Sequence, residues 1–177
     1  MTDRDLIIEP LDTKRHDRRS FSSGVVQVDN YFQKTANKLV KADNLRVHVM
    51  TTTDGDLIGF SGLNAHQIDH VELPHRFSRS RPGHGDIPAV YISMIGVDAR
   101  YQGQGLGGFL LADALRRILA ASEHIGVSLA LLDILDCGDP DRVARRRDLY
   151  LRYGFQALQD AELRLFMPVA SIAKLFS

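Results

Sequence analysis

The sequence predicts an α/β fold in which helices cover both faces of one sheet, built as a single domain over residues 1–177. Strand-like apolar runs alternate with segments of helical spacing along the whole chain. The central run, Tyr91 to Val97, leads through a glycine-rich turn directly into an amphipathic helix. With 177 residues and 44% hydrophobic content, the chain can bury about two thirds of its unfolded surface.

The first elements are a strand and a helix. Leu6 to Leu11 is predicted as a strand, and Pro10 places it at an edge or end of the sheet because proline cannot donate to a strand ladder. Ser22 or Ser23 is expected to cap the helix, since a serine hydroxyl can accept from its first free amides. Apolar residues recur on one stripe of that helix, namely Val25, Val28, Tyr31, Phe32, Thr35, Ala36 and Leu39.

A hairpin and a long irregular segment follow. Leu45 to Thr51 and Leu57 to Leu63 are predicted strands that flank Asp54-Gly55, a dipeptide typical of hairpin turns. The stretch from His66 to Pro88 contains four histidines and shows no clear period. We therefore expect a long loop there, and such loops in compact domains are usually functional or mobile.

The second half alternates strands and helices. Pro140 after Asp139 indicates a helix start, and Gly154 after Tyr153 indicates its end. The predicted elements are a strand at Tyr91–Val97, a helix at Phe109–Leu119, a strand at Val127–Ile134, a helix at Pro140–Tyr153, a strand at Glu162–Met167 and a helical turn within Pro168–Ser177.

The composition narrows the class of protein. Lys plus Arg equals Asp plus Glu at 22 each, so no overall charge favours nucleic acid. The single cysteine, Cys137, cannot form an internal disulfide and suits a reducing compartment. No apolar run approaches the length of a membrane span. We expect a cytoplasmic protein that has no membrane partner.

The residues after the central strand form a predicted phosphate-binding turn. Gln102 to Gly108 contains four glycines and opens a helix, whose first amides are unpaired and lie at the positive end of the helix dipole. Glycines let a diphosphate approach the backbone closely. Gly103-x-Gly105-x-x-Gly108 also fits the dinucleotide fingerprint, with Asp133 at about the expected distance. Too few residues follow Asp133 to complete a doubly wound sheet, which disfavours that alternative.

Two segments carry a family resemblance. Gln102-x-x-Gly105-x-Gly107 follows the strand end at Val97-Asp98, and Leu149-Tyr150-Leu151-Arg152-Tyr153-Gly154-Phe155 comes later. They resemble the acetyl-CoA pyrophosphate loop and the aromatic-Tyr-x-x-x-Gly-Phe segment of the GNAT acyltransferases, in the order and at the spacing of that family. The resemblance covers roughly Leu6 to Met167. It implies the GNAT fold, a mixed, mostly antiparallel sheet in which two parallel strands splay apart.

The same resemblance implies an N-acetyltransferase that moves an acetyl group from acetyl-CoA, its co-substrate, to a primary amine. The strand end would meet the thioester carbonyl, the turn would hold the pyrophosphate, and Tyr150 would protonate the departing thiolate, with Tyr153 as the fallback. The expected cofactor-binding residues are Ile95, Gly96, Val97, Gln102, Gly103, Gln104, Gly105, Leu106, Gly107 and Gly108. The base for the amine is left open among His48, His66, Glu72 and a chain of waters.

Two further groups of residues could bind a metal ion or an anion. The four histidines at 66, 70, 75 and 84 have no cysteine or firm acidic partner, so we expect no metal site. Five arginines make the helix before Gly154 basic, and such a face is solvated or guides an anionic substrate. They are Arg142, Arg145, Arg146, Arg147 and Arg152.

The acceptor stays open between a small molecule, a peptide and aminoacyl-tRNA. Phe21-Ser22-Ser23-Gly24 with Val28-Asp29-Asn30-Tyr31-Phe32 resembles the opening of GNAT toxins that acetylate the amino group of aminoacyl-tRNA. A toxin of a toxin–antitoxin pair is therefore the leading specialisation, with an antitoxin as partner and a homodimer left open. Those toxins usually carry an arginine where Met94 stands here. A CoA-binding module without catalysis is the remaining alternative.

Overall fold

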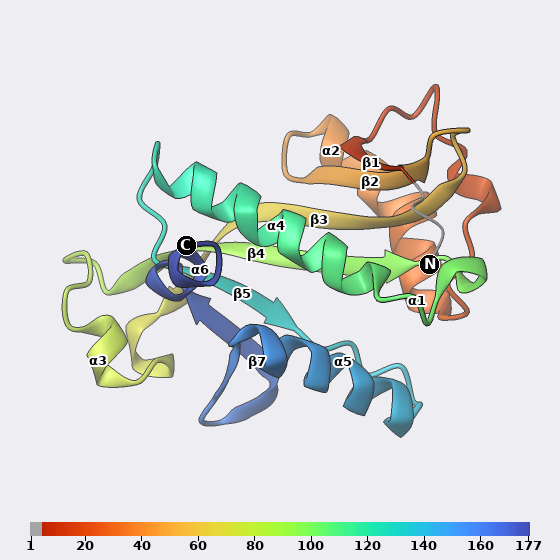
Figure 1. Ribbon diagram of the computed structural model, residues 1–177. Coiled ribbons are helices and arrows are strands. Elements are labelled where there is room, and N and C mark those ends of the chain that lie inside the picture. Colours follow the sequence, from red (N-terminus) through yellow and green to blue (C-terminus); the bar gives the residue numbers. More distant parts are fainter. Residues whose placement is uncertain (1–4) are drawn as a thin grey trace. The chain divides into compact units, whose positions relative to one another are not determined.

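The computed structural model describes residues 5–177 (Figure 1). These residues gather into two compact units. The first runs to Asn64 and includes Ser93–Asp113, and the second comprises Ala65–Ile92 and Ala114–Ser177. β3 (Leu57–Asp69), β4 (Asp86–Val97) and α4 (Leu106–Ser122) each contribute residues to both units. That the chain is one domain stays a prediction.

The first unit contains the N-terminal strands and the glycine turn. Its remaining elements are β1 (Leu6–Pro10), η1 (Arg18–Ser20), α1 (Val26–Asn30), η2 (Tyr31–Thr35), α2 (Ala36–Lys41), β2 (Arg46–Thr52) and η4 (Ala99–Tyr101). β1 pairs with β2 and β2 pairs with β3, both antiparallel. The predicted first strand and hairpin are confirmed.

An aromatic cluster fills one side of the sheet in the first unit. Phe60 of β3 stacks on Phe32 with ring centroids 4.2 Å apart and meets Phe21 edge-on at 5.6 Å. A Cβ at Gly96 of β4 would lie 2.7 Å from the Phe60 ring and 2.6 Å from Val28 of α1. Side chains of α1 and β3 therefore pack directly against the β4 backbone at Gly96.

The opposite side of the first unit is covered by the start of α4. Leu110 is fully buried and packs in one cluster with Met50 and Ile58. Since α1 lies on one face of these strands and α4 on the other, helices cover both faces, as the sequence predicts.

Because Gly59 has no Cβ, β3 packs closely against β4 and α4 at this position. A Cβ there would lie 2.6 Å from the Gly96 carbonyl oxygen and 2.8 Å from Leu110 Cδ1. The backbone oxygen cannot move away without shifting β4, so we expect Gly59→Ala to lower the free energy of unfolding by about 1–3 kcal/mol. Urea unfolding checks this. Gly126→Ala is the control because a Cβ there meets nothing within 4 Å, and equal stability losses in the two variants would contradict the prediction.

The helical segment after Ser23 departs from expectation in two ways. α1, η2 and α2 follow one another without a break, and the middle five residues form a π-helix. The prediction that Ser22 or Ser23 caps the helix is wrong, because the N-cap residue is Val25 and makes no side-chain cap bond. The Ser23 hydroxyl accepts from the Val25 amide and donates to the Asp29 carboxylate instead.

The second unit contains the parallel strand pair and the C-terminal elements. Those not yet named are η3 (His70–Glu72), α3 (His75–Ser78), β5 (Leu129–Asp133), α5 (Pro140–Tyr153), β6 (Gln156–Leu158), β7 (Ala161–Pro168) and α6 (Val169–Leu175). Ile68, Ile87 and Leu131 are buried in one apolar cluster with Phe166, which Phe77 of α3 meets edge-on at 5.3 Å.

The sheet is mixed, with the strand order β1-β2-β3-β4-β5-β7-β6. β4 and β5 run parallel, whereas β5–β7 and β6–β7 are antiparallel. The parallel pairing joins Ala89–Ile92 to Leu129–Leu132, and β4 then continues to Val97. The predicted mixed, mostly antiparallel fold is confirmed, while the splaying of the parallel strands stays a prediction.

The long predicted loop at His66–Pro88 is wrong in part. β3 continues to Asp69 and β4 already begins at Asp86, because Ile68 and Ile87 are core residues with 2% exposure. The helix ending at Gly154 is confirmed. The short strand β6 was not predicted. Within the described part of the chain, no helix has both the length and the apolarity that crossing a membrane requires.

Candidate functional site

The glycine turn lies between the end of β4 and the start of α4. η4 follows Val97, and its N-cap Asp98 accepts a hydrogen bond from the Arg100 amide. Gly103 and Gly105 then adopt φ angles of +79° and +75°, which L side chains rarely adopt. These two residues let the chain reverse within a few residues and enter α4 at Leu106.

The amides of this turn face no protein acceptor. In the described structure, the backbone N–H groups of Gln102 through Gly107 have no hydrogen-bond partner, whereas Gly108 already donates to the Gly105 carbonyl. Cβ positions at Gly103 and Gly105 have no atom within 4 Å, so the backbone is open to a ligand. A run of free amides at a helix N-terminus fits a diphosphate. The residues present therefore suit the coenzyme that the sequence implies.

At the end of β4, the side chains do not alternate between the two faces of the sheet as they do in a regular strand. The Ser93 hydroxyl lies 2.6 Å from the Tyr31 hydroxyl, and a Cβ at Gly96 would point at Val28, so positions three apart face the same side. Ile95 and Val97 pack in the cluster on the α4 side. A shift of this kind re-aims backbone groups at the strand end, where the resemblance to the GNAT acyltransferases would place the thioester carbonyl.

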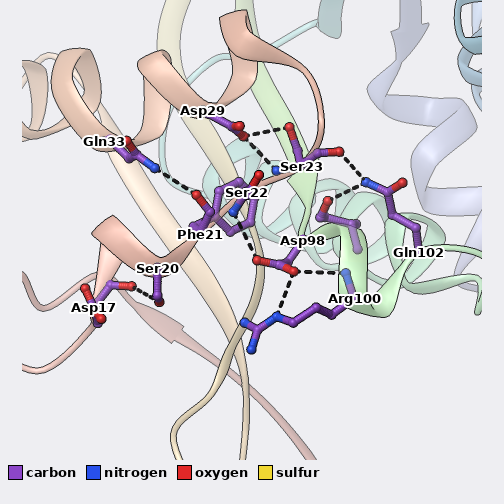
Figure 2. A network of polar contacts seen from close by, with 11 residues as sticks. Asp17, Ser20, Phe21, Ser22, Ser23, Asp29, Gln33, Asp98, Arg100 and Gln102 are labelled. Carbon is purple, nitrogen blue, oxygen red and sulfur yellow. Dashed lines mark hydrogen bonds and ion pairs between the residues drawn. The ribbon is translucent and has the colours of Figure 1, made fainter.

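Asp98 is a buried carboxylate beside the turn (Figure 2). It accepts from the Ser22 amide at 3.0 Å and from the Arg100 amide and Nε, both at 3.0 Å. Burial alone would raise the pKa of Asp98, but the hydrogen bonds from Arg100 and Ser22 outweigh it and hold the pKa below its usual value. Asp98 is not among the site residues predicted from the sequence.

The lowered pKa makes Asp98 a source of acid-sensitive stability. A carboxylate whose pKa is lower in the folded protein stabilises it above the unfolded pKa, about 4, and this contribution is lost as the pH falls through the folded pKa. We expect Asp98→Asn to cost about 1–3 kcal/mol at pH 7 because a buried donor loses its acceptor. Urea unfolding at pH 7 and below pH 4 should show the difference shrinking in acid. The exposed Asp54→Asn is the control, and a pH-independent difference would contradict the assignment.

Tyr150 lies in the last turn of α5, in the second unit. Its side chain is 7% exposed and meets the Phe155 ring edge-on at 5.9 Å. In the described residues its hydroxyl has no hydrogen-bond partner. Burial raises the pKa of this phenol, against a smaller opposing effect of Arg146, so the hydroxyl keeps its proton at neutral pH.

None of the base candidates acquires a clear role. The His66 ring lies 5.2 Å from the Tyr91 ring, and the Glu72 carboxylate accepts from the Asp69 amide in a capping box. His48 stands opposite Ser61 in the β2–β3 ladder. The base for the amine stays unassigned.

Asp133 at the end of β5 is bound within the protein. Arg164 donates to both carboxylate oxygens at 2.8 and 2.9 Å, and the Tyr91 hydroxyl donates at 2.8 Å. The hydrogen bond from Arg164 is the main reason why the pKa of Asp133 is lowered, with burial opposing it. These bonds give no support to the dinucleotide interpretation, in which Asp133 binds a ribose. Across residues 5–177, no three His, Cys, Asp or Glu side chains are placed to hold a metal ion.

Comparison with known proteins defines the class. A family model for the acetyltransferase (GNAT) domain matches residues 43–157, which carry the turn and Tyr150. The chain belongs to the GNAT acetyltransferase family and is an acyltransferase that uses acetyl-CoA. The predicted family, enzyme class and co-substrate are confirmed.

Two curated relatives are similar over most of their length. A probable toxin TacT from Sinorhizobium fredii is 58% identical over 170 residues, which cover 96% of this chain and 94% of the relative. A tRNA-acetylating toxin from Mycobacterium tuberculosis is 31% identical over 151 residues, 85% of each chain.

Solved structures share the fold. AtaT complexed with acetyl-methionyl-tRNAfMet superimposes with a TM-score of 0.83 at 24% identity, covering 98% of this chain and all of that one. AtaTR bound with AcCoA gives a TM-score of 0.80 at 24% identity, covering 98% of this chain and 99% of that one. At such identity the likeness concerns the fold alone.

Proposed function

We propose that this protein is the toxin of a toxin–antitoxin pair and acetylates the amino group of aminoacyl-tRNA. The observation that carries the proposal is the 58% identity to a probable toxin TacT across nearly the whole length of both chains. The tRNA-acetylating toxin at 31% identity supports the same acceptor. This specialisation has more support than an amine acceptor of unspecified kind.

Within this proposal the first unit holds acetyl-CoA. The free amides from Gln102 to Gly107 bind the diphosphate, and the backbone of Ile95–Val97 meets the thioester carbonyl. Gly108 contributes through the tight turn that its own amide closes. Acetyl-CoA supplies an activated acyl group and a thiolate leaving group.

Tyr150 supplies the proton for that leaving group. The amine nitrogen forms a bond to the acetyl carbon, the carbon–sulfur bond breaks, and the phenol hydroxyl gives its proton to the sulfur. The raised pKa of Tyr150 keeps the donor protonated before the reaction. The amine's own proton leaves to solvent or to a base, and the Tyr150 phenolate regains a proton from solvent.

The outer surface of α5 supports an anionic acceptor. Arg145, Asp148, Leu151 and Arg152 line a hollow of about 560 Å³. In residues 5–177, neither Arg145 nor Arg152 forms an ion pair. Unpaired guanidinium groups at an open hollow attract phosphates, and the local charge matters more here than a net charge of zero.

Controlled expression in a bacterial host tests the acceptor. We expect growth arrest, and nuclease digests of the recovered tRNA should contain N-acetyl-aminoacyl-adenosine by mass spectrometry. The purified protein with acetyl-CoA should modify charged tRNA and leave free amino acids and peptides unmodified. Normal growth combined with acetylation of a small amine or peptide would overturn the proposal.

The proposal also implies a binding partner and a cellular location for this protein. An antitoxin should bind the protein and restore growth, and the reaction belongs in the cytoplasm, where charged tRNA is used. A homodimer stays a prediction that light scattering on the purified protein checks.

A further inference from the structure

We propose that the side chain of Gln102 is a positioning residue that fastens the acetyl-CoA turn to the segment Phe21–Ser23. The inference rests on the proposed function of the turn and adds a role for a side chain that no ligand needs to touch. It also gives a structural role to Phe21–Ser23, a segment that the sequence marks only by its resemblance to the opening of GNAT toxins.

The side-chain amide of Gln102 donates hydrogen bonds to two backbone carbonyls of the protein. Its Nε2 donates to the Ser23 carbonyl at 2.7 Å and to the Val97 carbonyl at 2.8 Å. One side chain thus joins the residue that opens the turn to the end of β4 and to a segment 79 positions away. Figure 2 shows the side chain reaching from the turn to Ser23.

A second set of bonds lies beside the first. The Ser22 amide donates to the Asp98 carboxylate at 3.0 Å, and the Ala99 amide donates to the Ser22 carbonyl at 2.8 Å. With the Gln102 bond to Ser23, three hydrogen bonds link Ser22–Ser23 to Asp98–Gln102. These bonds hold the two stretches together.

The opening segment is itself fixed to the core. Phe21 is 1% exposed within the aromatic cluster, and its carbonyl accepts from Gln33 Nε2 at 2.8 Å. The Ser23 amide and hydroxyl both donate to the Asp29 carboxylate, at 2.8 and 2.7 Å. Gly24 follows with a φ of +83°. A rigid anchor thus stands on the far side of the Gln102 bond.

This anchor matters because the turn has little else to order it. Most of its amides lack protein acceptors and two of its glycines have positive φ angles, so binding a diphosphate would otherwise have to order a flexible backbone. Pre-ordering by Gln102 lowers that entropic cost and so favours affinity. The expected effect falls on acetyl-CoA binding and leaves the chemical step unchanged.

A matched pair of substitutions tests the inference. Gln102→Met removes the two donated bonds at nearly constant volume, and Gln104→Met makes the same change two positions along, where the side chain forms no hydrogen bond among the described residues. Losing two hydrogen bonds should raise the Kd for CoA and the KM for acetyl-CoA about tenfold beyond the Gln104 variant, with kcat within about twofold. Calorimetry and steady-state kinetics measure these values.

A second substitution at Gln102 keeps the inference testable if Gln102→Met does not fold. Gln102→Glu keeps the shape but sets a carboxylate against two carbonyl oxygens, and it should weaken CoA more than Gln104→Glu, which adds the same charge to the same turn. Thermal unfolding of each apo-protein gives its folded fraction. The inference is overturned if affinity falls only in step with that fraction, or if both Gln102 variants match their Gln104 counterparts. If the wild-type protein itself does not bind CoA, both the proposed function and this inference are overturned.

Discussion

Replacing Tyr150 by phenylalanine is expected to slow acetyl transfer by about 10²–10⁴-fold while acetyl-CoA still binds. The substitution removes only the hydroxyl, which has no partner among the described residues, so the contact of the ring with Phe155 is kept. The lost rate is the contribution of proton donation to the departing sulfur. Single-turnover transfer from labelled acetyl-CoA, with the Kd for CoA measured in parallel, checks both parts. On expression the variant should no longer arrest growth.

Tyr153→Phe is the matched control for that result. Tyr153 lies three positions along the same helix and is the other phenol that could serve as the acid. We expect its hydroxyl to be dispensable for transfer. If Tyr153→Phe loses the rate and Tyr150→Phe keeps it, the proton donor must be reassigned; if both keep it, the proton comes from solvent.

The sequence predicted best those elements whose ends are set by neighbouring residues. The Asp139 carboxylate accepts from the amides of Asp141 and Arg142, and Gly154 has a φ of +108°, so α5 begins and ends at the predicted residues. β6 and the outer part of β3 were missed. These residues form strands because they pair with other strands, and such pairing leaves little trace in the local sequence. A three-residue strand such as β6 has almost no local pattern.

For the candidate site, the sequence predicted the backbone groups of the turn but not the buried Asp98 or the side-chain bonds of Gln102. The glycines of the turn are recognisable because their spacing is local. Asp98 and the amide of Gln102 act on Ser22 and Ser23, more than 70 positions away, and no periodicity reports such a contact. One signal was available: an acidic residue directly after the central strand, where burial requires a partner.

The largest stability loss is expected from Phe60→Ala, at about 3–5 kcal/mol. Phe60 is fully buried and its ring contacts those of Phe32, Phe21 and Tyr31, so its removal leaves a cavity in the aromatic cluster. The cavity would also lie against Gly96, whose Cβ position is 2.7 Å from the same ring. We therefore expect weaker acetyl-CoA binding together with the lower stability. Urea unfolding at 25 °C gives the first quantity and calorimetry the second.

Phe109→Ala is the matched control, because this phenylalanine on α4 is 56% exposed and its removal creates no cavity. Its stability should change by no more than about 0.5 kcal/mol. The comparison separates two roles of the aromatic cluster. If Phe60→Ala is unstable but binds CoA normally in its folded fraction, the cluster supports the fold alone; if affinity falls as well, the ring also holds the end of β4 in place for the thioester. Equal stability of the two variants would contradict a close-packed core at Phe60.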